Sequence, residues 1–147
     1  MAINQLEPPA AHQLLTQHPD AVYLDVRTEE EFAQGHPAGA LNVPVVFMRP
    51  GGGPPYENPE FLAVVEKSLA RDQKLVVGCM AGGRSQRACD ILAQAGYSDL
   101  TNVRGGFGGA RDAGGQIVVK GWRDAGLPVS TELGDSAYAA LRKKAGL

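Results

Sequence analysis

The sequence predicts an α/β protein, a three-layer fold in which a mainly parallel sheet carries helices on both faces. Two observations predict this fold. Apolar runs of strand length, AVYLDV at 21–26 and KLVVGC at 74–79, alternate with segments whose apolar residues recur at helical spacing. Glycines and prolines that favour turns separate most of these segments. Strands that alternate with helices build parallel β-α-β units, and the helices then cover the sheet.

The first helix is predicted at residues 10–18. Pro8 and Pro9 precede it, and proline is favoured in the first turn of a helix because its missing N–H has no partner to lose there. Pro19 cannot continue the helix, so we expect it to end before this residue. The apolar run at 21–26 follows as a buried strand.

A short second helix is predicted between Thr28 and Gly35. Thr28 has Glu31 three residues later, the spacing of a capping box, and Gly35 is typical of a helix end. A loop follows, then a short apolar piece at 45–48. Residues 49–59, RPGGGPPYENP, are dense in turn formers and predict an inserted surface loop or lid.

A third helix is predicted at residues 59–70, with Asn58 as its cap and Pro59 in its first turn. The second buried strand, KLVVGC, comes next. Residues 85–95 place their apolar side chains on one helical face, and Gly96 is expected to end this helix.

The remaining elements are shorter. LTNVRGG at 100–106 predicts a third strand and a turn, and QIVVK at 116–120 is consistent with half of a small hairpin. The end of the chain predicts a capped terminal helix, because its cations lie near the helix C-terminus, where the dipole favours them. We therefore expect one domain over residues 1–130 and a helical tail over 131–147.

Composition excludes several classes of protein. A chain of 147 residues with 44% hydrophobic content is long enough for one core. The net charge of −2 does not suit nucleic acid or an anionic membrane, and the sequence contains no run long enough to span a bilayer. MAINQLEPPAAHQLL lacks the pattern of an export signal, so we expect a protein of the reducing cytoplasm.

The most informative segment lies where the second predicted strand ends, at Cys79. In an open α/β sheet, ligands bind beyond the carboxyl ends of the strands. Four residues, MAGG, separate Cys79 from Arg84, and a helix begins immediately afterwards. Backbone N–H groups of such a turn are able to point at the sulfur and, with the helix N-terminus, to favour its thiolate form. The candidate loop comprises Met80, Ala81, Gly82, Gly83, Arg84 and Ser85.

A lone cysteine at a strand end is more often a buried core residue, but Cys, Gly, Arg and Ser at these offsets favour a chemical role. Two roles stay open for Arg84. It supplies positive charge near the sulfur, or it pins the loop to Asp25 or Glu31. Asp25 and Arg27 are expected to order the loop from the neighbouring strand, with Asp25 as a hydrogen-bond acceptor rather than a proton-transfer group.

Three further side chains are assigned structural roles. Cys89 lies in the predicted helix and is interpreted as a small core residue, with a resolving thiol as the alternative. His36 is expected to form a hydrogen bond in its loop, and Trp122 is expected to pack in the core. The three histidines are dispersed, and the cysteines lack metal-ligand spacing, so no metal site is predicted.

The segment CMAGGRS resembles the C-x-x-G-x-R-S active-site loop of single-domain rhodaneses, sulfurtransferases that carry sulfur as a cysteine persulfide. YLDVRTEEEFAQGHPAGALNVP is similar to the family's D-V-R, E-F and G-H-I-x-G-A-x-N-I-P segments, with Pro37 in place of the usual isoleucine. NVRGGF, GW and AGLPV resemble the V-x-G-G, W and A-G-L-P-V positions near the end of the family's domain. The resemblance covers about residues 4 to 130. Two segments are longer than in the minimal domain of this family. They are the loop at 49–59 and the stretch at 107–120.

The resemblance implies that Cys79 takes sulfur from a small donor such as thiosulfate and passes it to an acceptor. The implied acceptors are cyanide in assays and, in the cell, a thiol such as glutathione, thioredoxin or a protein cysteine. No cofactor is implied. Two alternatives stay open: a persulfide carrier or regulatory module within a larger complex, and a phosphatase-like enzyme. Phosphatases place five residues between cysteine and arginine, so the four found here favour sulfur transfer.

Overall fold

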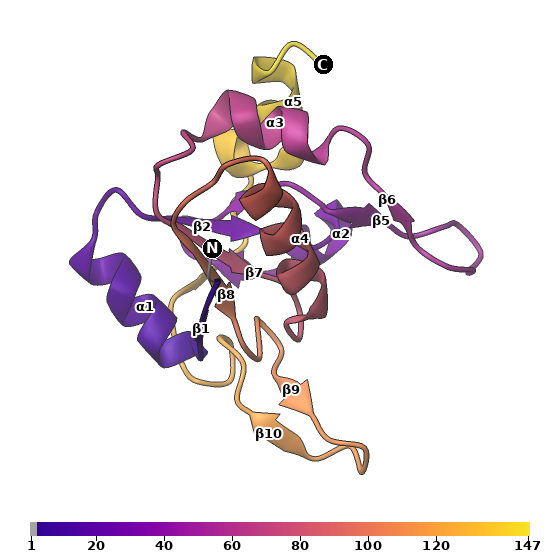
Figure 1. Cartoon of the computed structure of the whole chain (residues 1–147). Coiled ribbons are helices and arrows are strands. Elements are labelled where there is room, and N and C mark those ends of the chain that lie inside the picture. The colour runs from indigo at the N-terminus through magenta and orange to yellow at the C-terminus, as the bar shows by residue number, and fades with distance from the viewer. Residues whose placement is uncertain (1–2) are drawn as a thin grey trace.

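The structure, a computed structural model, describes residues 3–147. Its central sheet has five strands in the order β1-β8-β7-β2-β4 (Figure 1). Every neighbouring pair in this sheet is parallel, which confirms the predicted fold class. The five strands are β1 (Asn4–Leu6), β2 (Val22–Asp25), β4 (Leu41–Asn42), β7 (Leu75–Gly78) and β8 (Leu100–Val103).

Helices cover both faces of this sheet. Side chains alternate along a strand, so Leu75 and Val77 of β7 join one hydrophobic cluster while Val76 joins the other. The first cluster includes residues of α3, α4 and α5, and the second includes residues of α1 and α2. The helices are α1 (Pro8–Gln17), α2 (Glu29–Gln34), α3 (Phe61–Ser68), α4 (Gly83–Gln94) and α5 (Tyr138–Lys144), with a 3-10 turn at Gly134–Ser136.

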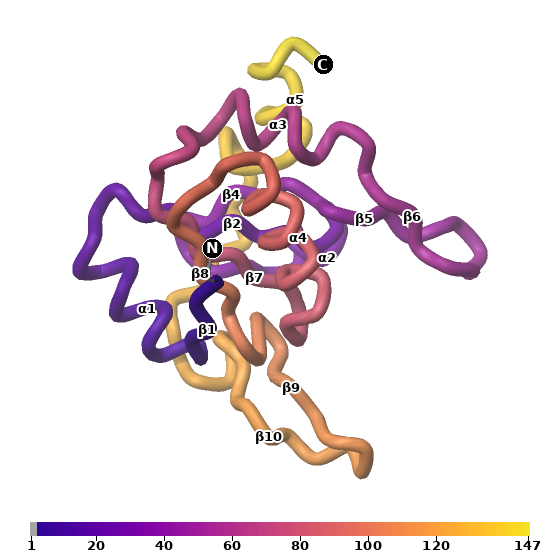
Figure 2. Tube along the Cα trace, viewed as in Figure 1, coloured from indigo at the N-terminus to yellow at the C-terminus, as the bar shows by residue number. Residues whose placement is uncertain are grey.

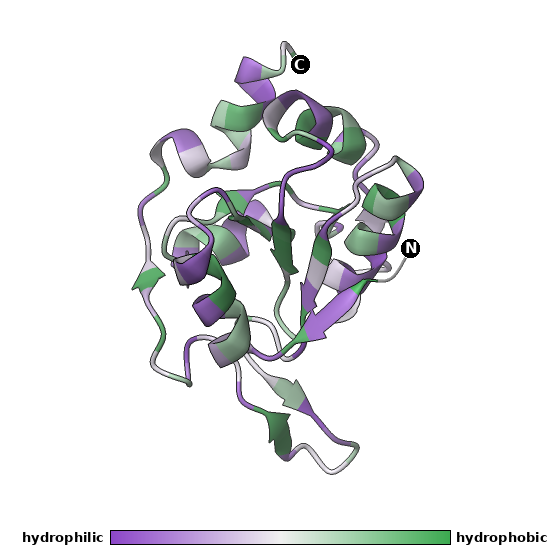
Figure 3. Cartoon of the chain, turned by 60° about the vertical axis from the view of Figure 1, so that its left-hand side comes forward, coloured by the Kyte–Doolittle hydropathy of each residue, from purple (hydrophilic) through white to green (hydrophobic). Residues whose placement is uncertain are grey.

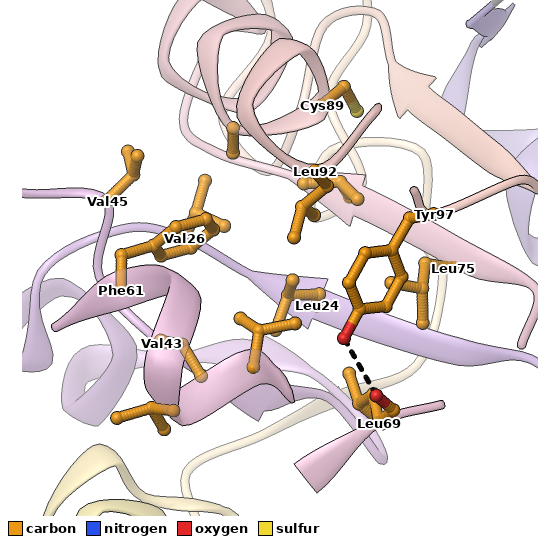
Figure 4. Packing of buried hydrophobic residues seen from close by; sticks show 14 of the residues in the cluster. Leu24, Val26, Val43, Val45, Phe61, Leu69, Leu75, Cys89, Leu92 and Tyr97 are labelled. Carbon is orange, nitrogen blue, oxygen red and sulfur yellow. Dashed lines mark hydrogen bonds between the residues drawn. The ribbon is translucent and has the colours of Figure 1, made fainter. Parts of the chain in front are cut away.

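Tyr97 belongs to the larger cluster and has a polar hydroxyl that needs a hydrogen-bond partner. Figure 4 shows Tyr97 beside Leu75 and Leu24, with its hydroxyl directed at Leu69. This hydroxyl donates a hydrogen bond to the Leu69 carbonyl oxygen at 2.8 Å. A buried tyrosine normally finds such a partner, and here the bond ties the segment after α4 to the end of α3.

The N-terminal strand was not predicted. β1 carries the exposed residues Asn4 and Gln5, so its sequence has no apolar strand pattern. Its pairing partner is β8, almost a hundred residues away, and the pairs run from Asn4 with Thr101 to Leu6 with Val103. Because this strand is formed by a distant partner, local pattern alone does not reveal it.

The capping box of α2 is confirmed. Thr28 Oγ1 accepts a hydrogen bond from the Glu31 N–H, and the Glu31 carboxylate accepts one from the Thr28 N–H. The following stretch, predicted as loop, contains β4, which pairs Leu41 with Leu24 of β2. A strand of two residues is too short to give a periodic signal.

Two other helix starts differ from prediction. α3 begins at Phe61, and its N-cap is Glu60 rather than Asn58. Asn58 Oδ1 instead accepts a hydrogen bond from the Glu60 N–H at 3.0 Å, in the turn before the helix. α4 begins at Gly83, two residues before the predicted start, so the helix N-terminus lies closer to Cys79 than expected.

The two longer segments form antiparallel hairpins. β5 (Val46–Phe47) pairs with β6 (Tyr56–Glu57), and β9 (Ala110–Arg111) pairs with β10 (Ile117–Val119), which confirms the hairpin predicted from QIVVK. Figure 2 shows that both hairpins project from the body of the molecule. Figure 3 shows β10 as a strongly hydrophobic segment of its hairpin, and Ile117 and Val118 are exposed there.

The C-terminal segment contributes one strand to a separate two-stranded sheet. β11 (Val129–Ser130) pairs with β3 (His36–Pro37), next to α2. The predicted terminal helix is present as α5, which lies beside α3 (Figure 1) and has no side-chain cap. Tyr138 and Leu141 of α5 are buried in the larger cluster.

Across residues 3–147, every helix is either too short or too polar to span a bilayer.

Candidate active site

Cys79 directly follows β7, at the carboxyl end of the sheet, and the loop that contains it leads into α4. The Gly82 N–H donates a hydrogen bond to Cys79 Sγ at 3.0 Å, and Ser85 Oγ lies 3.4 Å from the sulfur. Among the described residues, Gly82 has the one backbone N–H that donates to Sγ. The sequence predicted several such N–H groups, and the structure has one backbone N–H and one hydroxyl beside the sulfur. Cys79 lies beyond the carboxyl end of its strand, where ligands are expected to bind, but it is only 2% exposed.

The loop that follows Cys79, residues 80–84, lies at the surface of the protein. Ala81 and Gly83 are exposed, while Met80, Gly82 and Arg84 are half-buried. Gly82, the N-cap of α4, has φ +124°, a conformation that side-chain-bearing residues rarely adopt. The glycine therefore permits the turn that brings its own N–H onto the sulfur.

The loop is held from behind by the turn that follows β8. The N–H groups of Gly105, Phe107 and Gly108 donate hydrogen bonds to the carbonyl oxygens of Ala81, Cys79 and Met80, respectively, at 3.2, 2.8 and 2.9 Å. These bonds satisfy three successive carbonyl groups of the loop on one side. The backbone conformation around Cys79 is thus set by a segment more than twenty residues later.

This close approach requires glycine at position 106, where a Cβ would meet backbone, whereas at position 108 a Cβ would meet the flexible Met80 side chain. A Cβ on Gly106 would lie 2.3 Å from the Cys79 carbonyl oxygen, and a Cβ on Gly108 would lie 2.5 Å from Met80 Sδ. Gly105 and Gly106 form the glycine pair of the family resemblance, but the contact of Gly106 with the loop appears only in the fold. Trp122 supports this turn, since its N–H donates to the Gly106 carbonyl oxygen and its ring is buried, as predicted.

Asp25 and Arg27 form a buried ion pair beside the loop. Arg27 donates to Asp25 through Nε and one terminal nitrogen, and the same terminal nitrogen donates to the Gly35 carbonyl oxygen at 2.7 Å. The side chains are 2% and 1% exposed. The Arg27 guanidinium also lies 4.5 Å from the centre of the Phe107 ring. Asp25 is therefore an acceptor that orients Arg27, and Arg27 supports the turn behind the loop.

The structure resolves the two roles left open for Arg84. Its guanidinium donates two hydrogen bonds to the Glu31 carboxylate, at 2.7 and 3.0 Å, so Arg84 pins the start of α4 to α2. These bonds to Glu31 raise the pKa of Arg84, burial opposes them, and the nearby Glu31 and Cys79 charges raise it further. The pin to Glu31 is thus shown, and the second role, positive charge near the sulfur, stays a prediction.

Glu31 provides a test of this pin. Burial raises the pKa of Glu31, but the hydrogen bonds from Arg84 and Thr28 and the charge of Arg84 outweigh it and hold the pKa below the usual value of 4.5. A depressed pKa in the folded state stabilises the protein above the unfolded-state pKa, and this stabilisation disappears as the pH falls through the folded-state value.

We therefore expect Glu31→Gln, which keeps the capping box, to lower the free energy of unfolding by about 1 kcal/mol near pH 7. The difference from the wild type should shrink as the pH falls below the usual value of 4.5. Denaturant unfolding over this pH range measures it, with Glu30→Gln on the exposed side of α2 as the matched control. A difference that does not change with pH would contradict the assigned charge interaction.

A cavity of about 120 Å³ lies next to the loop. Met80 and Phe107 line it, together with two arginines, Arg27 and Arg123. Glu31 also lines it, but its charge is paired with Arg84. Arg27 is likewise paired, with Asp25. Arg123 is more than half exposed and its carboxylate neighbour, Asp124, lies at 3.6 Å, so Arg123 is the least neutralised cation of this cavity.

The remaining candidates have structural positions. Cys89 is fully buried, and Figure 4 shows it on α4 above Leu92; burial raises its pKa to about 12. This agrees with a core residue and gives no support to a resolving thiol. His36 lies 2.7 Å through Nδ1 from the Phe32 carbonyl oxygen, as predicted for a loop hydrogen-bonder. Across the described residues, no three His, Cys, Asp or Glu side chains gather as metal ligands.

Comparison with known proteins decides the family. A family model described as "Rhodanese-like domain" matches residues 7–113, which contain Cys79 and its loop. The chain belongs to the rhodanese-like family. This rhodanese-like chain is 46% identical over 92 residues to "Protein HIGH ARSENIC CONTENT 1, mitochondrial" of Arabidopsis thaliana, in an alignment that covers 63% of the chain and 53% of the plant protein. The chain thus spans about half the length of that relative.

Two further comparisons support the rhodanese-like assignment. The chain is 37% identical over 112 residues to "Thiosulfate sulfurtransferase 18" of the same plant, covering 75% of this chain and 72% of that protein. The crystal structure of Rv0390 from M. tuberculosis superposes with a TM-score of 0.73 at 29% identity and covers 90% of this chain and 100% of its own. The rhodanese-like fold predicted from the motifs is therefore confirmed.

Proposed function

We propose that this protein is a sulfurtransferase that moves sulfane sulfur through a persulfide on Cys79. The observation that carries the proposal is the position of Cys79 Sγ, which accepts a hydrogen bond from the Gly82 N–H at the N-terminus of α4. A backbone donor and the positive end of a helix both favour a negative sulfur. The family and the relatives named as sulfurtransferases support the same class of reaction.

The proposed reaction has two displacement steps. The Cys79 thiolate attacks the outer sulfur of thiosulfate, a new S–S bond forms, the S–S bond of thiosulfate breaks, and sulfite leaves with the electron pair. An acceptor such as cyanide or a thiolate then attacks the outer sulfur of the persulfide, and the Cys79 thiolate leaves. Covalent catalysis of this kind needs a nucleophile and donors fixed in advance, so the proposal includes no cofactor.

Two features support a small anionic donor. The cavity beside Met80 includes Arg123, whose exposed and weakly paired charge favours the approach of an anion. Cys79 is buried while the loop that follows it reaches the surface, which favours compact reactants. Glutathione, thioredoxin and protein cysteines remain the proposed cellular acceptors, in the reducing cytoplasm expected from the sequence.

The test combines mass spectrometry and turnover. The protein is exposed to thiosulfate, and we expect one added sulfur atom on the peptide that contains Cys79, followed by thiocyanate formation when cyanide is supplied. Added sulfur with no thiocyanate from any of several donors would favour the alternative of a persulfide carrier. No added sulfur on that peptide with thiosulfate or with other sulfane donors would contradict the proposed function.

A further inference from the structure

A chain of polar side chains runs from the candidate loop to the outer surface of α4. Ser85 Oγ lies 2.5 Å from Asn102 Oδ1 on β8. Asn102 Nδ2 donates to Gln5 Oε1 on β1 at 2.9 Å, and Gln5 Nε2 donates to Gln86 Oε1 at 2.6 Å. Gln86 Nε2 donates to Asp90 Oδ1 at 3.2 Å. The chain thus connects the loop, two strands and α4.

The carboxylate at the end of this chain sets its direction. An ionised carboxylate only accepts hydrogen bonds, so Gln86 must turn its amide nitrogen toward Asp90 and its oxygen toward Gln5. The same reasoning applies to each amide in turn. Asn102 consequently presents its oxygen, an acceptor, to Ser85.

Ser85 therefore faces more acceptors than it has protons. Its hydroxyl carries one proton, and Asn102 Oδ1, the Gly82 carbonyl oxygen at 3.1 Å and Cys79 Sγ at 3.4 Å all lie within reach. Ser85 and Asn102 are buried. A proton given to Asn102 is not available to the sulfur, while the oxygen lone pairs of Ser85 then accept from a neutral thiol.

We propose that Asn102 is a positioning residue that competes with the Cys79 sulfur for the hydroxyl proton of Ser85. While the sulfur is a neutral thiol, the proton stays on the Asn102 side. When the sulfur is a thiolate, the hydroxyl turns to it and Asn102 Oδ1 loses its donor. The proposal deepens the proposed function, on which it rests, because the same thiolate attacks the donor and later leaves when sulfur is passed on.

The competition predicts the effect of removing the acceptor. Asn102→Leu keeps a similar side-chain volume but leaves the Ser85 proton free for the sulfur. We expect the thiolate fraction at a pH below its midpoint to rise about threefold to tenfold, the factor that a typical net hydrogen bond contributes. The ultraviolet absorbance of the thiolate across pH, less that of the matching Cys79→Ser variant, measures this change without any sulfur donor.

Other ionisable groups near the sulfur stay the same in this experiment. Those whose charges interact with Cys79 are Tyr23 on β2 and Arg84 and Cys89 on α4. Thr101→Val, on the opposite face of β8, is the matched control and should leave the midpoint unchanged. If Asn102→Leu does not fold, Gln5→Ala on the exposed edge strand carries the test, because it frees the Asn102 amide to rotate and should move the midpoint in the same direction.

A double-mutant cycle separates the proposal from a merely structural effect. In a Ser85→Ala background there is no proton to compete for, so Asn102→Leu should cause no further shift. A shift that persists in that background, or a folded Asn102→Leu protein with the wild-type midpoint, would overturn the proposal. Because the titration uses no sulfur donor, a failure to form thiocyanate would count against the proposed function and not against this inference.

Discussion

Replacing Cys79 with serine is expected to abolish thiocyanate formation from thiosulfate and cyanide. A serine hydroxyl is not ionised near neutral pH and does not form a persulfide, so the proposed covalent path has no nucleophile. The rate should fall at least about 1,000-fold, to the background of the uncatalysed reaction. Ser85 and Gly82 would still offer hydrogen bonds at position 79, so the loop should keep its conformation.

Cys89 supplies the matched control for this experiment. It is the other cysteine of the chain, it is buried in α4, and burial raises its pKa to about 12. Cys89→Ala should therefore retain turnover per folded molecule. Thiocyanate formation that survives Cys79→Ser, or that is lost specifically in a folded Cys89→Ala protein, would contradict the assignment of the nucleophile.

Replacing Arg27 with leucine is expected to cause the largest loss of stability. The change leaves the Asp25 carboxylate buried without its ion-pair partner, and Gly35 loses a donor to its carbonyl oxygen. Breaking a buried pair on one side costs about 3 to 5 kcal/mol, because the remaining charge has lost both water and its partner. Denaturant unfolding of the variant and the wild type measures the loss.

A second substitution tests the physical reason for that loss. Adding Asp25→Asn to Arg27→Leu removes the unpaired charge, so the double variant should be more stable than the single one. Arg27→Lys keeps a cation but loses the planar fork that contacts both Asp25 and Gly35, and it should fall between the wild type and Arg27→Leu. Equal losses for the single and double variants would indicate packing against Phe107 rather than charge as the cause.

The elements with long apolar patterns were predictable. β2 and β7 are buried parallel strands, and their runs of apolar residues predict them without any knowledge of the neighbours. The capping box at Thr28 is equally local, because both partners lie within one turn. By contrast, β1 and β4 are short, and each exists because a distant strand supplies its hydrogen bonds.

The candidate site divides in the same way. Cys79, its loop and the helix after it could be found from residue types at fixed spacing. Which groups contact the sulfur could not: the predicted cradle of several amides proved to be the Gly82 N–H and the Ser85 hydroxyl. Asn102, the second acceptor for that hydroxyl, lies on β8 and gave no local signal.

The sequence by itself determined the fold class, the position of the thiol at the end of a central strand and the resemblance to the rhodaneses. These depend on patterns within a few residues, and local patterns follow from backbone geometry and side-chain type. The tertiary structure alone decided the burial of the sulfur, the partner of Arg84 and the hold of residues 105–108 on the loop. Each of these features requires contact between segments that are far apart in the sequence. Only the packing of the folded chain decides which of those contacts form.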